Sequence, residues 1–163
     1  MSYKSAKQGW YRVSNPGKFI SQVQESKTVM KSTRMNEGFL EINFKSNLER
    51  IGLKYCDMNK YIKRYSLEPF PIKYCSPVDN KVHRYFVDLY IEFENNQKFL
   101  VEIKSSGETR EPKLPSKKTQ KAMMNYQKAL QTFAVNTAKW NAAIAFCKEK
   151  GMRFIILTEN ELK

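Results

Sequence analysis

Two apolar runs decide the fold of this chain: Arg84-Tyr85-Phe86-Val87-Asp88-Leu89-Tyr90-Ile91 and, after a short polar turn, Phe99-Leu100-Val101-Glu102-Ile103-Lys104. Alternating apolar residues, many of them aromatic or β-branched, are typical of strands. Asp88, Glu102 and Lys104 interrupt the two runs, and charges on buried strands are costly unless they bind something. The two runs therefore predict a β-hairpin that carries a functional site.

The register of this hairpin follows from its apolar faces. Successive side chains of a strand point to opposite faces, so burying both apolar faces together fixes which residues lie opposite each other. The expected pairs are Val87 with Ile103, Leu89 with Val101, and Ile91 with Phe99. The same register places Asp88 opposite Glu102. It requires a connection of odd length, which predicts a three-residue turn at residues 94–96 with Asn96 in the left-handed region.

Two carboxylates directly opposite each other repel unless a cation lies between them. We expect Asp88 and Glu102 to hold Mg²⁺, which prefers oxygen ligands and keeps room for water and phosphate, with Mn²⁺ as a substitute. Lys104 shares a face with Glu102. There its ammonium can position an attacking water, stabilise charge that develops on a phosphate, or do both. The pattern favours a metal-dependent nuclease.

A helix is predicted over residues 47–65, from apolar residues at three- and four-residue steps. Those residues are Leu48, Ile51, Tyr55, Met58 and Ile62. Ser46 is the expected N-cap, and Glu49 falls in the first turn. The Glu49 carboxylate has two open roles, capping of this helix and ligation of the metal.

The rest of the chain predicts strands and helices around the hairpin. We expect a short strand over 38–44, an edge strand over 72–75 and a long polar loop over 105–116. A second helix follows from Thr119, and a third, capped by Asn136 or Thr137, ends at Gly151. Residues 152–158 predict a last buried strand beside the hairpin. This order indicates an α/β or α+β architecture, a mixed sheet with helices packed on it.

The composition indicates a polyanionic partner. Lys and Arg total 29 against 16 Asp and Glu, a formal net charge of +13 over 163 residues. Nucleic acid is the first candidate, since no basic amphipathic helix suggests a membrane partner. The residues expected to grip phosphates are Lys73, Arg84, Lys117, Lys118 and Lys121. We expect one nuclease-like domain over residues 38–163, preceded by a basic N-terminal arm over residues 1–37.

Several other classes of protein are disfavoured. The three cysteines have no CxxC spacing, which argues against a disulfide framework and a zinc site. With His83 as the only histidine, a His-based mechanism lacks parts, and a surface or phosphate contact is expected for this residue. The first ten residues lack the apolar core of a signal peptide, and no apolar run approaches the roughly 20 residues of a membrane span. The protein is therefore expected to work inside a cell.

Asp88 on one strand and Glu102-Ile103-Lys104 on the next resemble the signature of the PD-(D/E)XK endonuclease superfamily, in which a preceding helix contributes a Glu. The chain from about Ile42 to Leu162 is also similar to the head completion nucleases of T-even-type tailed phages. Six blocks in order carry that similarity: Phe44-Lys45-Ser46-Asn47-Leu48-Glu49, Arg84-Tyr85-Phe86-Val87-Asp88, Phe99-Leu100-Val101-Glu102-Ile103-Lys104, Glu108-Thr109-Arg110-Glu111-Pro112, Asn136-Thr137-Ala138-Lys139-Trp140-Asn141-Ala142-Ala143 and Lys150-Gly151-Met152-Arg153-Phe154-Ile155-Ile156-Leu157-Thr158-Glu159. The endonuclease subunit of heteromeric transposases looks like a more distant relative.

This resemblance implies a restriction-endonuclease-like core in which Glu49, Asp88 and Glu102 are the active-site carboxylates and Lys104 is the active-site lysine. It implies Mg²⁺-dependent hydrolysis of phosphodiester bonds in double-stranded DNA during phage head completion, with head or portal proteins as partners. The implied location is the cytoplasm of a bacterial host or the virion head. Two alternatives stay open: a non-catalytic DNA-binding head-assembly protein, and a structure-selective resolvase or transposase-type nuclease.

Overall fold

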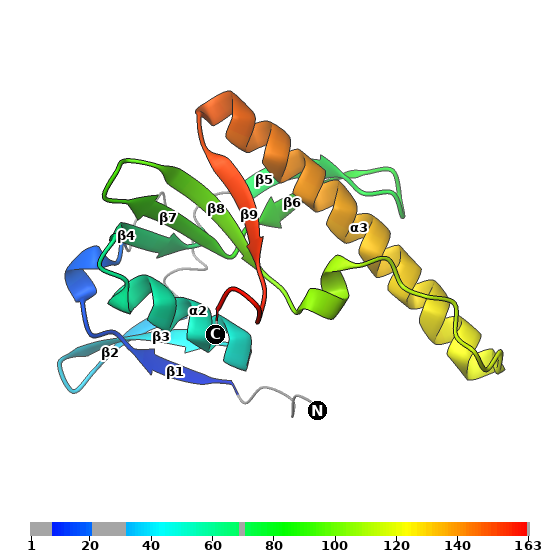
Figure 1. Cartoon of the computed structure of the whole chain (residues 1–163), viewed down its shortest axis with the longest axis horizontal. Helices are drawn as coiled ribbons and strands as arrows, with labels where there is room; N and C mark the ends of the chain where they lie inside the picture. The colour runs from blue at the N-terminus through cyan, green and yellow to red at the C-terminus, as the bar shows by residue number, and fades with distance from the viewer. Residues whose placement is uncertain (1–7, 21–31, 69–70, 163) are drawn as a thin grey trace.

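The computed structural model describes residues 8–20, 32–68 and 71–162 (Figure 1). In chain order its elements are β1 (Gly9–Arg12), η1 (Pro16–Lys18), β2 (Thr33–Asn36), β3 (Phe39–Phe44), α2 (Asn47–Met58), β4 (Ile62–Leu67), β5 (Pro71–Cys75), β6 (Val82–Phe86), β7 (Leu89–Phe93), β8 (Lys98–Ile103), η2 (Ser106–Thr109), α3 (Gln120–Lys150) and β9 (Arg153–Leu157).

The centre of the molecule is a mixed sheet with strand order β4-β7-β8-β9. The β4–β7 and β7–β8 pairs are antiparallel, and β9 is parallel to β8. One core lies between this sheet, α2 and the N-terminal strands, and a second lies between the sheet, α3 and the β5–β6 hairpin (Figure 1). The expected α+β architecture, with helices packed on a mixed sheet, is confirmed.

The register expected for β7 and β8 is confirmed over the length of their ladder. Two of the predicted pairs form, Leu89 with Val101 and Ile91 with Phe99. The Phe93 N–H donates to Gln97 O at 2.9 Å, so three residues form the turn. Asn96 has a φ of 64°, the left-handed conformation that Asn tolerates.

The strand expected to run through Asp88 is divided in two. β6 pairs with β5 in a separate two-stranded sheet, and Val87 and Asp88 form the connection to β7. This bend places Val87 in the core on the α3 face, whereas Leu89 lies in the core on the α2 face. The ladder ends at Leu89 with Val101, so the two remaining expected pairs, Val87 with Ile103 and Asp88 with Glu102, do not form.

The first helix is shorter than predicted. α2 begins as expected, with Ser46 Oγ accepting a hydrogen bond from the Glu49 N–H at 3.0 Å, but it ends at Met58. The chain then forms β4, which pairs with β7. Ile62 continues the helical spacing of the sequence, but it is the first residue of β4, and its side chain is buried in the core. Pairing with the central sheet outweighs the local helical pattern here.

The two C-terminal helices expected from the sequence are one continuous helix, α3. Thr119 caps its start, accepting a bond from the Ala122 N–H at 3.1 Å. Thr137 does not begin a new helix, because its hydroxyl donates to Phe133 O within the same helix at 2.8 Å. Gly151 ends α3 with a φ of 69°, as expected for a left-handed C-cap.

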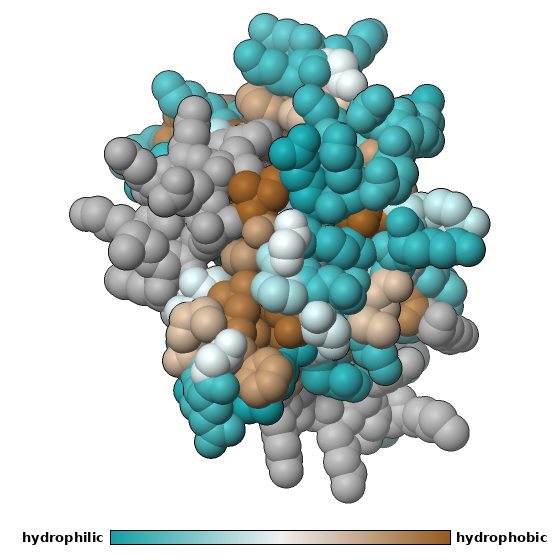
Figure 2. Space-filling model, turned by 90° about the vertical axis from the view of Figure 1, so that its left-hand side faces the viewer, coloured by the Kyte–Doolittle hydropathy of each residue, from teal (hydrophilic) through white to brown (hydrophobic). Residues whose placement is uncertain are grey.

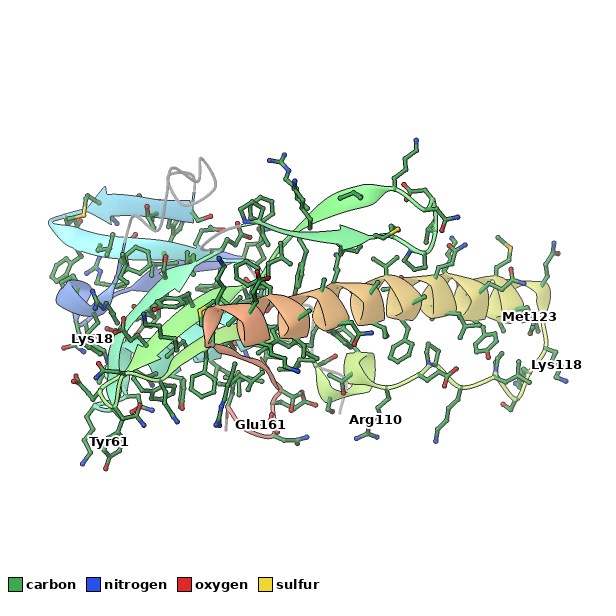
Figure 3. The ribbon with its side chains drawn as sticks, turned by 90° about the horizontal axis from the view of Figure 1, so that it is seen from above. Lys18, Tyr61, Arg110, Lys118, Met123 and Glu161 are labelled. Carbon is green, nitrogen blue, oxygen red and sulfur yellow. The ribbon has the colours of Figure 1, made fainter. Side chains whose placement is uncertain are left out.

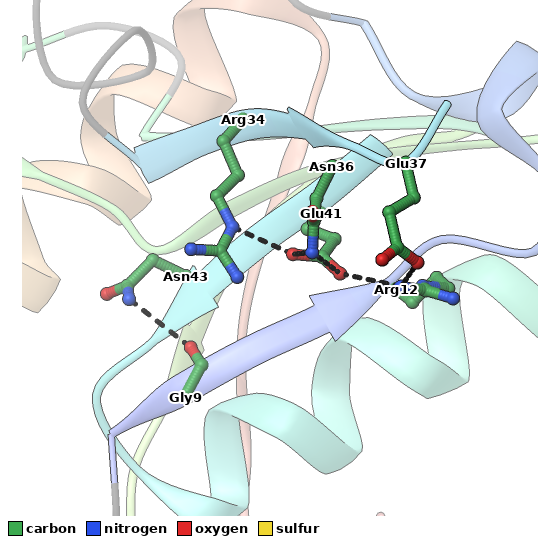
Figure 4. A network of polar contacts seen from close by, with 7 residues as sticks. All are labelled: Gly9, Arg12, Arg34, Asn36, Glu37, Glu41 and Asn43. Atoms are coloured by element: carbon green, nitrogen blue, oxygen red, sulfur yellow. Dashed lines mark hydrogen bonds and ion pairs between the residues drawn. The ribbon is translucent and has the colours of Figure 1, made fainter. Parts of the chain in front are cut away.

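The described N-terminal segment shares a sheet with β3. β1 and β2 both pair with β3, so the boundary expected at residue 37 falls in the β2–β3 turn. Glu41 ties the three strands together, since Arg34 donates to its carboxylate at 2.8 Å and Arg12 at 3.3 Å (Figure 4). These bonds, that of Arg34 above all, lower the pKa of Glu41. Residues 1–7 and 21–31 of the expected arm lie outside the described residues.

The molecular surface is mostly polar where the β7–β8 turn lies. Figure 2 shows small apolar patches among hydrophilic side chains on that face. Among the described residues, none of the helices is long and apolar enough to cross a membrane.

Asp57, at the end of α2, fastens the N-terminal segment to the core. Its fully buried carboxylate accepts hydrogen bonds from Tyr11 Oη at 2.6 Å and from the N–H groups of Ser14 and Asn15 at 2.8 Å each. Hydrogen bonds to a charged group contribute more than neutral ones. This carboxylate therefore holds three donors that no strand ladder satisfies.

We expect Asp57→Ala to lower the free energy of unfolding by about 3 kcal/mol, since buried donors are left without an acceptor. Urea unfolding followed by circular dichroism measures this change. The matched control is Glu149→Ala on the exposed face of α3, which should stay within about 0.5 kcal/mol of the parent protein. Equal stability of the two variants would contradict the anchoring role of Asp57.

Candidate active site

Asp88 lies at the bend that precedes β7. Its Oδ2 accepts a hydrogen bond from the Ile103 N–H at 2.8 Å. The last backbone pair of the β7–β8 ladder is Leu89 with Val101. The Asp88 carboxylate therefore binds the Ile103 N–H just beyond the end of this ladder. At the bend, the Asp88 side chain accepts the Ile103 N–H that a strand partner would otherwise pair with. The Asp88 side chain remains half-buried.

Glu102 lies in β8 and is 7% exposed. Its carboxylate accepts a hydrogen bond from the Tyr85 hydroxyl at 2.5 Å, and the Lys104 ammonium lies 3.8 Å from Glu102 Oε1. Lys139 approaches from α3, with its Nζ 5.5 Å from the centre of the Tyr85 ring. One phenol and two ammonium groups therefore surround this buried carboxylate.

The two carboxylates influence each other. Burial, followed by repulsion from Glu102 and then from Glu49, raises the pKa of Asp88 from 3.8 to about 8, against the opposing Ile103 N–H and Lys104. Burial also raises the pKa of Glu102, while the Tyr85 hydroxyl, Lys104 and Lys139 favour its ionised form. The neighbouring positive charges do not fully offset burial and repulsion, and an added cation would favour ionisation of both groups.

A pocket beside Asp88 holds further acidic groups. Glu49 and Glu68 both line it, together with Lys45. The Glu49 Oε2 accepts a bond from the Lys45 N–H at 2.7 Å, one residue before the N-cap Ser46, so this carboxylate holds the chain that enters α2 rather than an N–H group of the helix itself. Burial raises the pKa of Glu68, and Lys45 lowers it. Glu49 therefore both bonds to the chain just before α2 and lines the pocket of Asp88.

The structure brings all four expected residues to one end of the central sheet. Asp88 interacts electrostatically with Glu49, Glu102 and Lys104. Their carboxylates do not converge on a single point: within residues 8–20, 32–68 and 71–162, no three His, Cys, Asp or Glu side chains are placed to hold a metal ion. The fold provides two carboxylates that repel each other, Asp88 and Glu102, with that of Glu49 nearby.

Two comparisons identify the family of this chain. A family model described as "TnsA-like endonuclease N terminal" matches residues 59–159. The chain belongs to this TnsA-like endonuclease family. It is also 33% identical over 123 residues to the "Head completion nuclease" of Enterobacteria phage T4, an alignment that covers 76% of this chain and 82% of the phage protein.

The TnsA-like endonuclease match contains most of the site. Asp88, Glu102 and Lys104 lie inside residues 59–159, whereas Glu49 precedes them. The resemblance expected from the sequence is confirmed by these comparisons, as is a nuclease of the restriction-endonuclease-like fold. The roles of the four individual residues remain predictions.

Three residues of this TnsA-like endonuclease join the site without having been singled out for it. Tyr85 reads as a core residue in its strand, and Lys139 lies 35 residues beyond Lys104 on another element. Glu68 follows β4, whose pairing with β7 brings it to Asp88: the Glu68 N–H donates to Asp88 O at 3.0 Å. All three depend on tertiary contacts, which local sequence patterns do not reveal.

The predicted phosphate-binding residues fall in two places. Lys73 and Arg84 are exposed and lie opposite each other in the β5–β6 hairpin. Lys117 and Lys118 directly precede α3, and Lys121 lies in its first turn. Figure 3 shows Lys118 far from the sheet, at the outer end of this helix. His83 is at the surface, with its Nε2 2.8 Å from Asp79 Oδ2.

The raised pKa of Asp88 predicts how pH changes stability. Between pH 4 and 8 the folded protein retains a proton that an unfolded carboxyl group, with a pKa near 3.8, has released. Stability of the metal-free protein should therefore fall as pH rises through this window, by at most about 1.4 kcal/mol for each pH unit.

Asp88→Asn keeps an acceptor for Ile103 and removes the ionisable group. We expect it to flatten the pH dependence and to stabilise the metal-free protein at pH 8. Urea unfolding at pH 5 and pH 8 in EDTA measures both effects, with the exposed Glu149→Gln as the control. A variant less stable than the parent at pH 8 would contradict the assigned charge state.

Proposed function

We propose that this protein is a Mg²⁺-dependent endodeoxyribonuclease that acts on double-stranded DNA in the completion of phage heads. The observation that carries the proposal is the pair Asp88 and Glu102 beside Lys104 in a chain of the TnsA-like endonuclease family. The phage setting is supported by the name of the T4 relative. Host cytoplasm or virion head as location, and head or portal proteins as partners, belong to the same proposal.

The donors at this site fit a hard divalent cation. Asp88 and Glu102 offer carboxylate oxygens. Burial raises the pKa of both groups, and repulsion from Glu102 further raises that of Asp88, so a bound cation would favour the ionised forms. These two residues would hold Mg²⁺ or Mn²⁺, with Glu49 as the nearby third carboxylate. When bound, Mg²⁺ would supply Lewis-acid stabilisation of phosphate charge and ease the ionisation of water.

Lys104 supplies a positive charge of the protein itself. Its side chain is 27% exposed, which leaves the ammonium open to a ligand while it stays 3.8 Å from Glu102. An ammonium held in this way stabilises negative charge that develops on a phosphate oxygen and orients a nearby water. Ionised Glu102, favoured by Tyr85 and Lys139, holds Lys104 near the reacting phosphate.

DNA is the substrate that fits the charge of the chain. The net charge of +13 favours a polyanion, and nuclease relatives point to nucleic acid. Lys73 and Arg84 on the β5–β6 hairpin, and Lys117, Lys118 and Lys121 near the start of α3, would contact phosphates. A protein that binds DNA through these residues without cutting it is the outcome to be excluded.

Nicking of supercoiled plasmid tests the proposal directly. With Mg²⁺, the protein should convert supercoiled plasmid to the open-circular form, and EDTA should abolish this reaction. Lys104→Ala and Asp88→Ala should each lower the rate at least about 100-fold, since each removes charge at the reacting phosphate or its metal. Lys98→Ala, at the exposed start of β8, is the control and should keep the parent rate.

DNA binding of the same variants, measured in EDTA by fluorescence anisotropy, should change less than about threefold, because the site contributes few of the phosphate contacts. Parent-like nicking by both variants would reject the site. Binding without nicking by the parent protein would favour the non-catalytic alternative.

Cation binding can be followed without any reaction. Ca²⁺ or Mg²⁺ should raise the melting temperature of the parent protein in a concentration-dependent way, because a ligand that binds only the folded state stabilises it. Asp88→Asn and Glu102→Gln should remove this shift. Anomalous scattering from a Mn²⁺-soaked crystal should place the ion between residues 88 and 102; an ion elsewhere would contradict the assigned ligands.

The family match supports a second candidate, a structure-selective or transposase-type nuclease. The two candidates differ in substrate preference. A head-completion role predicts cutting of linear and blunt duplex DNA, whereas a resolvase-like enzyme would favour branched or single-stranded junctions. Rates on these substrates, compared at equal enzyme concentration, distinguish the candidates.

A further inference from the structure

The first half of α3 extends beyond the rest of the fold. The buried residues of α3 all lie in its second half: Asn136, Trp140, Ala143 and Cys147. In Figures 1 and 3 the earlier turns project away from the sheet, and the chain that precedes the helix runs back beside them. We call residues 110–135 the basic arm, which is distinct from the N-terminal arm expected over residues 1–37.

The basic arm carries exposed charge of one sign. Its exposed cations are Arg110, Lys113, Lys117, Lys118, Lys121 and Lys128. Glu111 is its only carboxylate, and the next acidic residue along the chain is Glu149. Within the described residues, none of the six cations takes part in an ion pair. Such a surface fits a polyanion whose charges are spread over a distance, as those of a DNA backbone are.

A membrane surface fits this arm less well. Helices that lie in a bilayer interface need a broad apolar face on one side. The large apolar side chains exposed on the arm are Leu114 and Met124, on separate segments of it. Those two residues do not form such a face, so the charge pattern favours nucleic acid.

The same helix connects the basic arm to the candidate active site. Lys139 lies over the Tyr85 ring and favours the ionised form of Glu102. Lys121 precedes Lys139 by 18 residues in one unbroken helix. At 1.5 Å per residue the two are about 27 Å apart, the length of about eight base pairs of B-DNA.

We propose that the basic arm lies along duplex DNA on one side of the cleavage site and contacts backbone phosphates about eight base pairs from the bond that is cut. This inference rests on the proposed nuclease function and adds a substrate requirement to it. Because Lys121 of the arm and Lys139 of the site lie on the same continuous helix, the fold sets this distance. Duplexes too short to reach the arm lose these contacts.

The test compares two pairs of substitutions that remove equal charge. Lys118→Gln/Lys121→Gln changes the arm, and Lys148→Gln/Lys150→Gln changes exposed lysines at the opposite end of α3. In EDTA, the arm pair should lower the slope of log affinity against log salt for a 30-base-pair duplex by about two. The control pair should leave the slope within about 0.5 of the parent value.

DNA cleavage in Mg²⁺ tests the distance between the arm contacts and the bond that is cut. The arm pair should cut a 30-base-pair duplex about tenfold more slowly than the parent protein, and a 10-base-pair duplex at the same rate. On an end-labelled 40-base-pair duplex, the parent should avoid the last eight or so base pairs at one end of each strand. The arm pair should lose that asymmetry.

An equal loss on long and short duplexes, or equal effects of the two pairs, would overturn the proposal. If the parent protein binds DNA but does not cut it, the proposed nuclease function fails. The salt slopes measured in EDTA then test by themselves whether the arm contacts DNA. An unchanged slope in the arm pair would then reject it.

Discussion

This site depends on one constraint: two carboxylates, Asp88 and Glu102, lie at one end of a sheet that is covered on both faces. Asp88 and Glu102 lose much of their hydration there, and each raises the free energy of ionising the other. The fold offsets this cost with groups from other parts of the chain: the Ile103 N–H, the Tyr85 hydroxyl and the ammonium groups of Lys104 and Lys139. The offset is partial, because the pKa values of both carboxyl groups stay raised.

The bend at Val87 and Asp88 makes this placement possible. A straight strand would have left Asp88 as one more residue of the β7–β8 ladder. Instead, β6 joins β5 in another sheet and carries Tyr85 toward the α3 face, where its hydroxyl reaches Glu102. The bend also frees the Asp88 carboxylate to accept from Ile103 while it lines the pocket shared with Glu49. One local change of direction thus assembles groups from both faces of the sheet.

Part of this arrangement could be predicted from the sequence, because it depends on local periodicity. The alternation of β7 and β8 and the odd turn with Asn96 determine the register. Patterns with two meanings led to errors: Ile62 satisfies both a helical and a strand spacing, and Thr137 resembles an N-cap but bonds back within α3. The roles of Tyr85, Lys139 and Glu68 come from tertiary contacts between distant segments.

Glu49 shows how one residue can serve the fold and the site together. Its bond from the Lys45 N–H lies at the surface, where such a bond contributes about 1 kcal/mol because water can replace it. Ser46 caps α2 independently through its own side chain. A ligand at Asp88 that attracts the Glu49 carboxylate therefore competes with a weak contact, and the helix keeps its cap when the carboxylate turns. The Ser46 cap thus keeps the start of α2 in place, while the weak bond from the Lys45 N–H leaves the Glu49 carboxylate able to move.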